Sequence, residues 1–348
     1  MQGRNLSPQE MFLRLADDHR PTYAFASAGL SFADWKAKAR PEVLSCLGRF
    51  PERVDPRPKL LAEWDHRGLR KQKWVIEAQP HLSGNLYINI PPGTKDEQPR
   101  PAILCWHGHG EFGKEPVMGN DSEPALRENM ATHNYEYGQK MAEAGFVTFA
   151  VDWLGAGDLN DSGKPNWRNC AQGRDWCNLY YLHATMLGMT SISINVRQGM
   201  AATDFVSSLP FVDSGRLGVM GLSGGGTMST WTAFCDERIK AAEIICYSDL
   251  WRDFGIRDVN YCGMQVAPGL YALVDLPDLQ GLLAPLPLLI DIGSYDKCFM
   301  VDTAMECFRK LEKIYEAAGA RDQLHLDLFG GGHRWGANKS VEFFRSAL

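Results

Sequence analysis

Residues 221–225 read Gly-Leu-Ser-Gly-Gly, and the serine at their centre is a candidate nucleophile. The motif directly follows a short apolar run at 216–220 and directly precedes a helix-like pattern. A serine hydroxyl attacks best from a sharp strand-to-helix turn, and flanking glycines allow the backbone to make that turn. The pattern therefore predicts that Ser223 attacks the carbonyl in an acyl-transfer reaction. A glycine-rich turn whose serine only caps the helix is the alternative interpretation.

A second glycine-containing motif, His-Gly-His-Gly at residues 107–110, follows the apolar run 102–106. The tetrahedral intermediate of acyl transfer carries a negative oxygen that backbone N–H groups stabilise. We expect one donor to be Gly224, the residue after the serine, and the other to be His109. A metal pair of the H-x-H type is the alternative, but such metallo-hydrolases continue with Asp-His, whereas Glu-Phe follows here at 111–112. We therefore expect no metal and no other cofactor.

His333 is the candidate general base, and it follows three glycines after the last strand-like run. A catalytic imidazole on a loop at the carboxyl edge of the sheet can reach over the serine. Asp296 lies just after the strand-like run 286–292, where a carboxylate can hold that imidazole in the required tautomer. Asp249, after the preceding run, is the second candidate for the acid.

The chain order Ser223, Asp296, His333 is the order found in α/β-hydrolases. With these motifs the sequence resembles the α/β-hydrolase superfamily, and most of all the branch that holds dienelactone-hydrolase-like proteins and acetyl-xylan-esterase-like carbohydrate esterases. The resemblance extends from about Trp74 to the C-terminus. Dienelactone hydrolases carry a cysteine nucleophile, so the serine in this chain favours ester hydrolysis instead. The matching stretches lie at 101–114, 144–157, 209–226 and 238–247.

The resemblance implies a serine carboxylic-ester hydrolase that forms an acyl-enzyme with a small-molecule ester, and carbohydrate esters such as acetylated sugars are plausible substrates. One alternative is a serine peptidase of the prolyl-oligopeptidase kind, although the segment before Trp74 is too short for the propeller of those enzymes. Another is a non-catalytic binding protein on the same fold. The acyl group, the alcohol and the oligomeric state are not predicted.

Aromatic residues gather on segments near the expected active-site edge of the sheet. Sugar rings stack on such faces, so these side chains are candidates for the substrate pocket; the alternative is that they pack an inserted segment onto the sheet. They are Trp153, Trp176, Tyr180 and Trp335, together with Trp167 and Tyr181.

Strand-like and helix-like segments alternate from Lys73 onward. This alternation predicts an α/β protein, an α/β-hydrolase fold with a mostly parallel central sheet and helices on both faces. Strands are expected at 74–78, 85–90, 102–106, 146–151, 216–220, 243–246, 286–292 and 324–329. Helices are expected at 135–144, 196–209, 225–235, 301–318 and 340–348.

Residues 1–72 are predicted to form an N-terminal helical extension packed on a catalytic domain at 73–348. Ser7 and Pro8 are typical of a helix start, and a helix should follow through 11–18. Ser31 begins a second helical stretch that Pro41 is expected to break. The segment near 156–195 is long and aromatic, which indicates an insertion above the sheet.

The composition is that of an ordinary globular protein, with 348 residues, 45% hydrophobic and 22% charged. The formal charge of −6 provides no basic surface for nucleic acid or for an anionic membrane. The first residues lack the apolar segment of a secretory signal, and the nine cysteines show no paired framework. A cytoplasmic location with reduced thiols is therefore expected.

Overall fold

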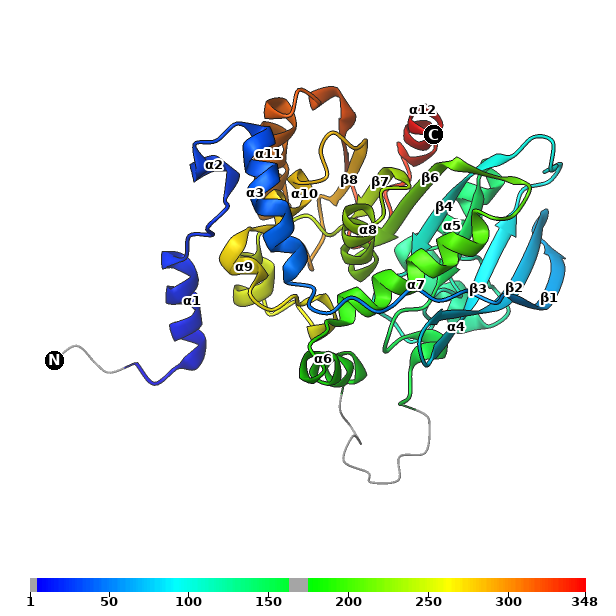
Figure 1. Ribbon diagram of the computed structural model, residues 1–348, viewed down its shortest axis with the longest axis horizontal. Coiled ribbons are helices and arrows are strands. Elements are labelled where there is room, and N and C mark those ends of the chain that lie inside the picture. The colour runs from blue at the N-terminus through cyan, green and yellow to red at the C-terminus, as the bar shows by residue number, and fades with distance from the viewer. Residues whose placement is uncertain (1–4, 163–174) are drawn as a thin grey trace.

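The computed structural model describes residues 5–162 and 175–348, and its centre is a nine-stranded sheet (Figure 1). The strands are β1 (Lys59–His66), β2 (Leu69–Gln79), β3 (Leu82–Ile90), β4 (Arg100–Trp106), β5 (Val147–Val151), β6 (Val212–Leu222), β7 (Ile239–Ile245), β8 (Leu288–Gly293) and β9 (Leu324–Phe329). Their spatial order is β1-β2-β3-β5-β4-β6-β7-β8-β9.

The first strands of the sheet pair antiparallel and the rest pair parallel. Antiparallel pairs join β1 to β2, β2 to β3 and β3 to β5. Every pairing from β5 through β4 to β9 is parallel, so the prediction of a mostly parallel sheet is confirmed. Because parallel strands end at the same edge, the loops after β4, β6, β8 and β9 meet there.

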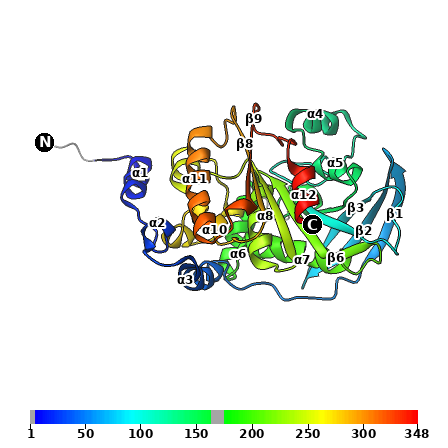
Figure 2. The ribbon, with the colours of Figure 1, turned by 90° about the horizontal axis from the view of Figure 1, so that it is seen from above.

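Helices cover both faces of the sheet: α4, α5 and α12 lie on one side, and α3, α6 and α7 on the other (Figure 2). The helices are α1 (Pro8–Asp18), α2 (Phe25–Ala28), α3 (Phe32–Ser45), α4 (Pro124–His133), α5 (Tyr137–Glu143), α6 (Trp176–Met186), α7 (Ser191–Val206), α8 (Gly224–Cys235), α9 (Leu270–Leu273), α10 (Leu276–Gly281), α11 (Val301–Ala317) and α12 (Ser340–Ala347). Shorter helical turns are η1 (Gly157–Leu159), η2 (Trp251–Arg257), η3 (Gly263–Gln265) and η4 (Arg321–Gln323).

Alternating side chains of the central strands form two apolar cores. Leu104 of β4 belongs to the larger core, together with Val196 of α7. Its neighbour Ile103 belongs to the smaller core, with Met141 of α5 and Phe343 of α12. Successive side chains of a strand point to opposite faces, so a central strand that is apolar at every position needs helices on both sides.

Helix α3 continues through Pro41, so the expectation of a break there is wrong. Proline lacks an N–H and removes one helical hydrogen bond. Trp35, Ala39 and Val43 of the same helix are fully buried in the larger core. The burial of this apolar face outweighs the lost bond and keeps the helix continuous.

The sheet begins earlier than the sequence analysis expected, because the boundary at 72–73 falls inside β2 and β1 precedes it. Most side chains of β1 are exposed, so this edge strand lacks the alternation by which a half-buried strand is recognised. Among the residues that the structure describes, the helices α1, α2 and α3 precede the sheet. The division of the chain into an extension and a catalytic domain stays a prediction.

The expected insertion at 156–195 is described in part. It contains η1, α6 and the first residues of α7, while Trp167 lies outside the described residues. In the described parts of the chain, no helix has the length and apolar character that crossing a membrane requires.

Candidate active site

Ser223 occupies a strained turn between the end of β6 and the start of α8. Its φ of 58° and ψ of −120° are unusual for a residue with a side chain. The turn is held by a 2.8 Å hydrogen bond from the Ser223 N–H to the Ile245 carbonyl of β7. A Cβ added at Gly221 or at Gly225 would lie 2.5 Å or 2.4 Å from a backbone oxygen, so both positions require glycine. The strain exposes the serine side chain at the sheet edge.

His333 and Asp296 meet across the loops that follow β9 and β8. The distance between His333 Nδ1 and Asp296 Oδ2 is 2.8 Å. The other carboxylate oxygen of Asp296 accepts backbone hydrogen bonds from Cys298 at 2.7 Å and Phe299 at 3.1 Å. Burial opposes ionisation of this carboxyl, but the hydrogen bonds and the His333 ring outweigh it and lower the pKa of Asp296. Asp296 therefore carries a charge that can hold the imidazole in one tautomer.

Asp249, the second candidate for the acid, has different partners. It is buried at the end of the loop after β7, and its Oδ1 accepts a 2.6 Å hydrogen bond from the Leu250 N–H. Burial raises the pKa of Asp249 to about 7. The carboxylate placed against His333 is thus that of Asp296, as the sequence analysis preferred.

A cavity of about 390 Å³ lies over the serine turn, and both Ser223 and His333 line it. Tyr135, Tyr261 and Phe299 contribute aromatic surface to its wall. The ring of Phe299 stacks on that of His333, with 5.7 Å between centroids and 18° between the planes. The structure therefore brings the proposed nucleophile and base to one concave site large enough for a small organic ligand.

The expected oxyanion loop also reaches this cavity, since Gly108 and His109 line it. The Gly108 N–H donates a hydrogen bond to the hydroxyl oxygen of Tyr135, which fixes the start of the loop. Gly224 is the first residue of α8, so its N–H is one of those that have no partner within the helix. Tyr135 lies in the segment between α4 and α5, and no motif in the sequence marks it.

The His107 side chain packs in the protein interior and does not pair with His109. Its ring is fully buried, lies 2.8 Å from the Gly108 carbonyl through Nδ1, and accepts a 3.3 Å hydrogen bond from the Trp153 N–H through Nε2. Burial lowers the pKa of His107 to about 4, so the ring is neutral. The His109 Nε2 instead lies 2.9 Å from Cys262 Sγ. Of the residues described, these two histidines do not form the H-x-H metal pair.

An ion cluster formed by the buried Lys114 and Asp152 with the exposed Asp158 connects the loops that follow β4 and β5, and the sequence analysis did not anticipate it. The Lys114 ammonium lies 2.7 Å from Asp152 Oδ2 and 2.8 Å from Asp158 Oδ2. Asp152 also accepts backbone hydrogen bonds from Lys114 at 2.8 Å and Asp158 at 2.9 Å. The cluster fixes the far end of the loop that carries His109. Asp152 directly follows a strand, and this position was the signal that could have revealed it.

The base loop is held from the opposite side by the end of α4. His133 Nδ1 donates to the His333 carbonyl at 3.0 Å, and the Trp335 N–H donates to the His133 carbonyl at 3.0 Å. The Asn134 amide donates to the Trp335 carbonyl at 3.1 Å. These contacts give His133 a positioning role that depends on two residues 200 positions apart in the chain.

The aromatic pocket predicted from the sequence does not form around Ser223 as expected. Trp335 is buried in the core, where its indole N–H donates to Glu243 at 3.0 Å and Ser340 at 2.9 Å. Trp153 is also fully buried and packs beneath the oxyanion loop, its centroid 5.1 Å from that of His109.

The two predicted pocket residues on α6 have partners of their own. The rings of Trp176 and Tyr180 lie 5.4 Å apart, and the Tyr180 hydroxyl donates to Asp161 at 2.6 Å. The described residues that line the cavity of Ser223 do not include Trp176 or Tyr180, and they do not include Trp153 or Trp335. The prediction that these four side chains line the substrate pocket is wrong for this cavity. An aromatic side chain near the sheet edge is stabilised by burial in the protein as well as by contact with a ligand, so its place in the sequence does not distinguish the two.

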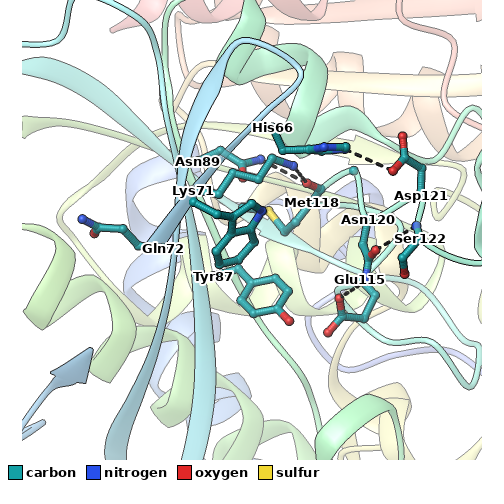
Figure 3. Close-up of a pocket in the computed structure, with 12 residues that line it drawn as sticks. His66, Lys71, Gln72, Tyr87, Asn89, Glu115, Met118, Asn120, Asp121 and Ser122 are labelled. Atoms are coloured by element: carbon teal, nitrogen blue, oxygen red, sulfur yellow. Dashed lines mark hydrogen bonds and ion pairs between the residues drawn. The ribbon is translucent and has the colours of Figure 1, made fainter. Parts of the chain in front are cut away.

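A second pocket of about 360 Å³ lies against β1, β2 and β3 (Figure 3). There the buried Lys71 ammonium donates to the Met118 carbonyl at 2.6 Å, and the Asn89 amide donates to the same oxygen at 3.3 Å. His66 lies 3.1 Å from Asp121 across the pocket. Burial lowers the pKa of Lys71 to about 8. In the described chain, this pocket and the cavity of Ser223 share no lining residue.

The sheet order, the strained serine after β6 and the histidine loop after β9 define an α/β-hydrolase fold. The model of the Abhydrolase family matches residues 1–326, and the chain belongs to that family. The predicted resemblance to the α/β-hydrolase superfamily is thereby confirmed. A relative described as hydrolase YtaP from Bacillus subtilis (strain 168) is 25% identical over 305 residues, which cover 86% of this chain and 94% of the relative.

Solved structures with the same fold include carbohydrate esterases. A structure described as an acetyl xylan esterase from Bacteroides fragilis has a TM-score of 0.72 and 20% identity, and the match covers 94% of this chain and 83% of the other. A glucuronoyl esterase from Solibacter usitatus has a TM-score of 0.67 and 15% identity, with 94% of this chain and 97% of the other covered. At these identities the likeness concerns the fold.

Proposed function

We propose that this protein is a serine carboxylic-ester hydrolase that forms an acyl-enzyme. The observation that carries the proposal is the 2.8 Å contact between His333 and Asp296 at a cavity that also contains Ser223. A charged aspartate, an oriented imidazole and a serine on a strained turn are the parts that nucleophilic acyl transfer requires.

In the proposed mechanism, Ser223 Oγ attacks the acyl carbon of the ester while His333 Nε2 accepts its proton. The oxygen of the tetrahedral intermediate becomes negative, and the backbone N–H groups of Gly224 and His109 stabilise it. His333 then returns the proton to the departing alcohol, which leaves the acyl group on the serine. Water, deprotonated by the same imidazole, releases the acid and restores the enzyme. Asp296 keeps Nδ1 protonated throughout and stabilises the imidazolium.

An ester of a carbohydrate is the substrate class that we propose. The names of two proteins with the same fold, an acetyl xylan esterase and a glucuronoyl esterase, support this choice. The cavity of about 390 Å³ is lined by Ser223 and His333 and by the aromatic rings of Tyr261 and Phe299, which suits a sugar ring next to a small acyl group.

Covalent labelling tests the nucleophile. A fluorophosphonate probe should modify Ser223, and Ser223→Ala should lower kcat by about 10⁶. Peptide mass spectrometry locates the adduct, and p-nitrophenyl esters of increasing chain length followed by acetylated sugars measure turnover. An adduct on another residue with Ser223 unmodified contradicts the assignment. A folded protein that neither reacts with the probe nor hydrolyses any ester supports the non-catalytic alternative.

A further inference from the structure

A group of three metal-binding side chains lies beside the cavity of Ser223. A ring nitrogen of His109 and the Sγ atoms of Cys177 and Cys262 all lie within 4.8 Å of one another, and the His109 Nε2 lies 2.9 Å from Cys262 Sγ. His109 lies in the loop after β4, Cys177 lies in the first turn of α6, and Cys262 directly precedes η3. The mechanism proposed above uses only the backbone of His109, so it leaves these three side chains without a role.

The backbone around the group is already held in place. The Gly263 N–H donates a 2.8 Å hydrogen bond to Asn178 Oδ1, which joins α6 to the segment that carries Cys262. Asp175 caps α6 by accepting a 3.0 Å hydrogen bond from the Cys177 N–H. The fold therefore already holds the three donor atoms within 4.8 Å of one another.

Two thiolates and an imidazole are the donor set of a thiophilic divalent cation such as Zn²⁺. In tetrahedral coordination two sulfur ligands at about 2.3 Å from one ion lie about 3.8 Å apart, and the three donor atoms here lie within 4.8 Å of one another. We propose that His109, Cys177 and Cys262 form a three-ligand Zn²⁺ site whose fourth position faces the cavity of Ser223. Both His109 and Cys262 line that cavity.

Zinc at this site should inhibit hydrolysis reversibly. The ion would tie the oxyanion loop to Cys262 and fill part of the cavity, so that substrate could not enter. This consequence rests on the proposed esterase function, whereas metal binding itself does not. The proposed chemistry runs through serine, imidazole and carboxylate, so we expect full turnover after exhaustive chelation, inhibition on addition of Zn²⁺, and recovery with EDTA.

Cobalt binding tests the site without any substrate. The reduced, metal-free, full-length protein should bind one Co²⁺ with thiolate-to-cobalt charge-transfer absorption in the near ultraviolet. Cys177→Ser and Cys262→Ser should each weaken binding by at least about 100-fold. Cys298→Ser, which removes another thiol of the same cavity, should not. Absence of the charge-transfer band in the wild type, or its persistence in both serine variants, overturns the proposal.

Protection from alkylation provides a measurement on the wild type alone, should a variant not fold. Bound Zn²⁺ should protect the half-buried Cys262 from iodoacetamide, with the half-buried Cys298 as the control read in the same mass spectrum. Equal alkylation of Cys262 with and without Zn²⁺ contradicts the proposal.

Inhibition needs its own control, because Cys246, Asp296 and His333 also offer ligand atoms within 4.8 Å of one another. Zinc should inhibit the wild type and should lose at least about 100-fold in potency against Cys177→Ser. Unchanged potency would show that zinc inhibits by binding Cys246, Asp296 and His333. It would overturn the proposal that zinc at the other site inhibits hydrolysis. If the protein hydrolyses no ester at all, the cobalt spectrum still tests whether a metal ion binds at the site.

Discussion

Asp296 and Asp249 are both buried carboxylates at the carboxyl edge of the sheet, and their surroundings shift their pKa values in opposite directions. Asp296 accepts two backbone hydrogen bonds and contacts the His333 ring, which together lower its pKa. Burial raises the pKa of Asp249 to about 7. Only a carboxylate that stays charged next to the imidazole can stabilise the imidazolium of the proposed mechanism.

Substitution of the two aspartates distinguishes their roles. Asp296→Asn should lower kcat by about 10⁴ with the fold intact, because the amide favours the wrong tautomer of His333. Asp249→Asn should lower kcat by about tenfold or less. Ester-hydrolysis kinetics on both purified variants measure the effect, and circular dichroism controls for folding. Near-normal turnover of Asp296→Asn beside an inactive Asp249→Asn would transfer the role of the acid to Asp249.

At the scale of elements, the turn between β6 and α8 rests directly on Trp153. A Cβ at Gly224 would lie 1.9 Å from the Trp153 ring, which cannot move freely because it packs against the rings of His107 and His109. The nucleophile turn and the oxyanion loop are therefore positioned by the same buried indole.

Adding one methyl group at this contact should disturb both loops. Gly224→Ala is expected to lower kcat by about 100-fold and to destabilise the protein by about 1–3 kcal/mol, because the ring must shift. Gly255→Ala in η2 is the matched control, since a Cβ there meets no atom within 4 Å, and it should change stability by less than about 0.5 kcal/mol. Kinetics and urea denaturation measure both variants. Wild-type turnover in Gly224→Ala would contradict the role given to Trp153.

Strand β7 carries a buried acid that links it to α12. The Glu243 Oε1 accepts hydrogen bonds from Trp335 at 3.0 Å and Ser340 at 2.7 Å. Burial raises the pKa of Glu243 from 4.5 to about 7, although these two hydrogen bonds favour the charged form. Burial also raises the pKa of its neighbour Asp291.

This acid should make stability depend on pH. Between pH 4.5 and about 7 the folded state holds a proton on Glu243 that the unfolded state has released, so stability should fall as the pH rises through this window. Glu243→Gln keeps an oxygen acceptor but cannot ionise, and it should reduce that slope. The remaining slope should come from Asp291, Asp249 and Asp278, because burial raises the pKa of each of these carboxyls as well. Urea denaturation at a series of pH values measures it. An unchanged slope would show that Glu243 does not titrate there.

At the scale of the whole molecule, the N-terminal helices are anchored to the hydrolase core. Trp35 of α3 is fully buried in the larger core, which also contains Leu104 of β4. Its indole N–H donates to the Tyr23 carbonyl at 2.8 Å, and its ring packs against that of Phe25 with 5.0 Å between centroids. By contrast, the ion pair between Asp17 of α1 and Arg252 of η2 joins two half-exposed side chains.

The two contacts should contribute very differently to stability. Trp35→Ala is expected to lower the free energy of unfolding by about 3–5 kcal/mol, because it leaves a large cavity in the shared core. Asp17→Asn should cost less than about 1 kcal/mol, as for other exposed pairs. Urea denaturation followed by fluorescence compares them. If Trp35→Ala left the main transition unchanged, the N-terminal helices would be a separate folding unit, contrary to the prediction of an extension packed on the catalytic domain.

The sequence by itself determined the features that depend on neighbouring residues. The apolar runs predicted the central strands, because a strand buried on both faces is apolar at nearly every position. The positions of Ser223, Asp296 and His333 followed from them, because each lies in a short loop after a strand and parallel strands end at one edge. The order of these residues also indicated the fold family.

The tertiary structure alone decided what depends on contacts between distant segments. It placed Trp335 in the core, set Tyr135 and His133 against the catalytic loops, and kept α3 continuous through Pro41. It also brought Cys177 and Cys262 to His109. An aromatic ring, a proline or a thiol has the same local signature whether it faces a core, a cavity or an ion. The free energy that chooses among these environments comes from burial against residues far away in the chain, which no local pattern records.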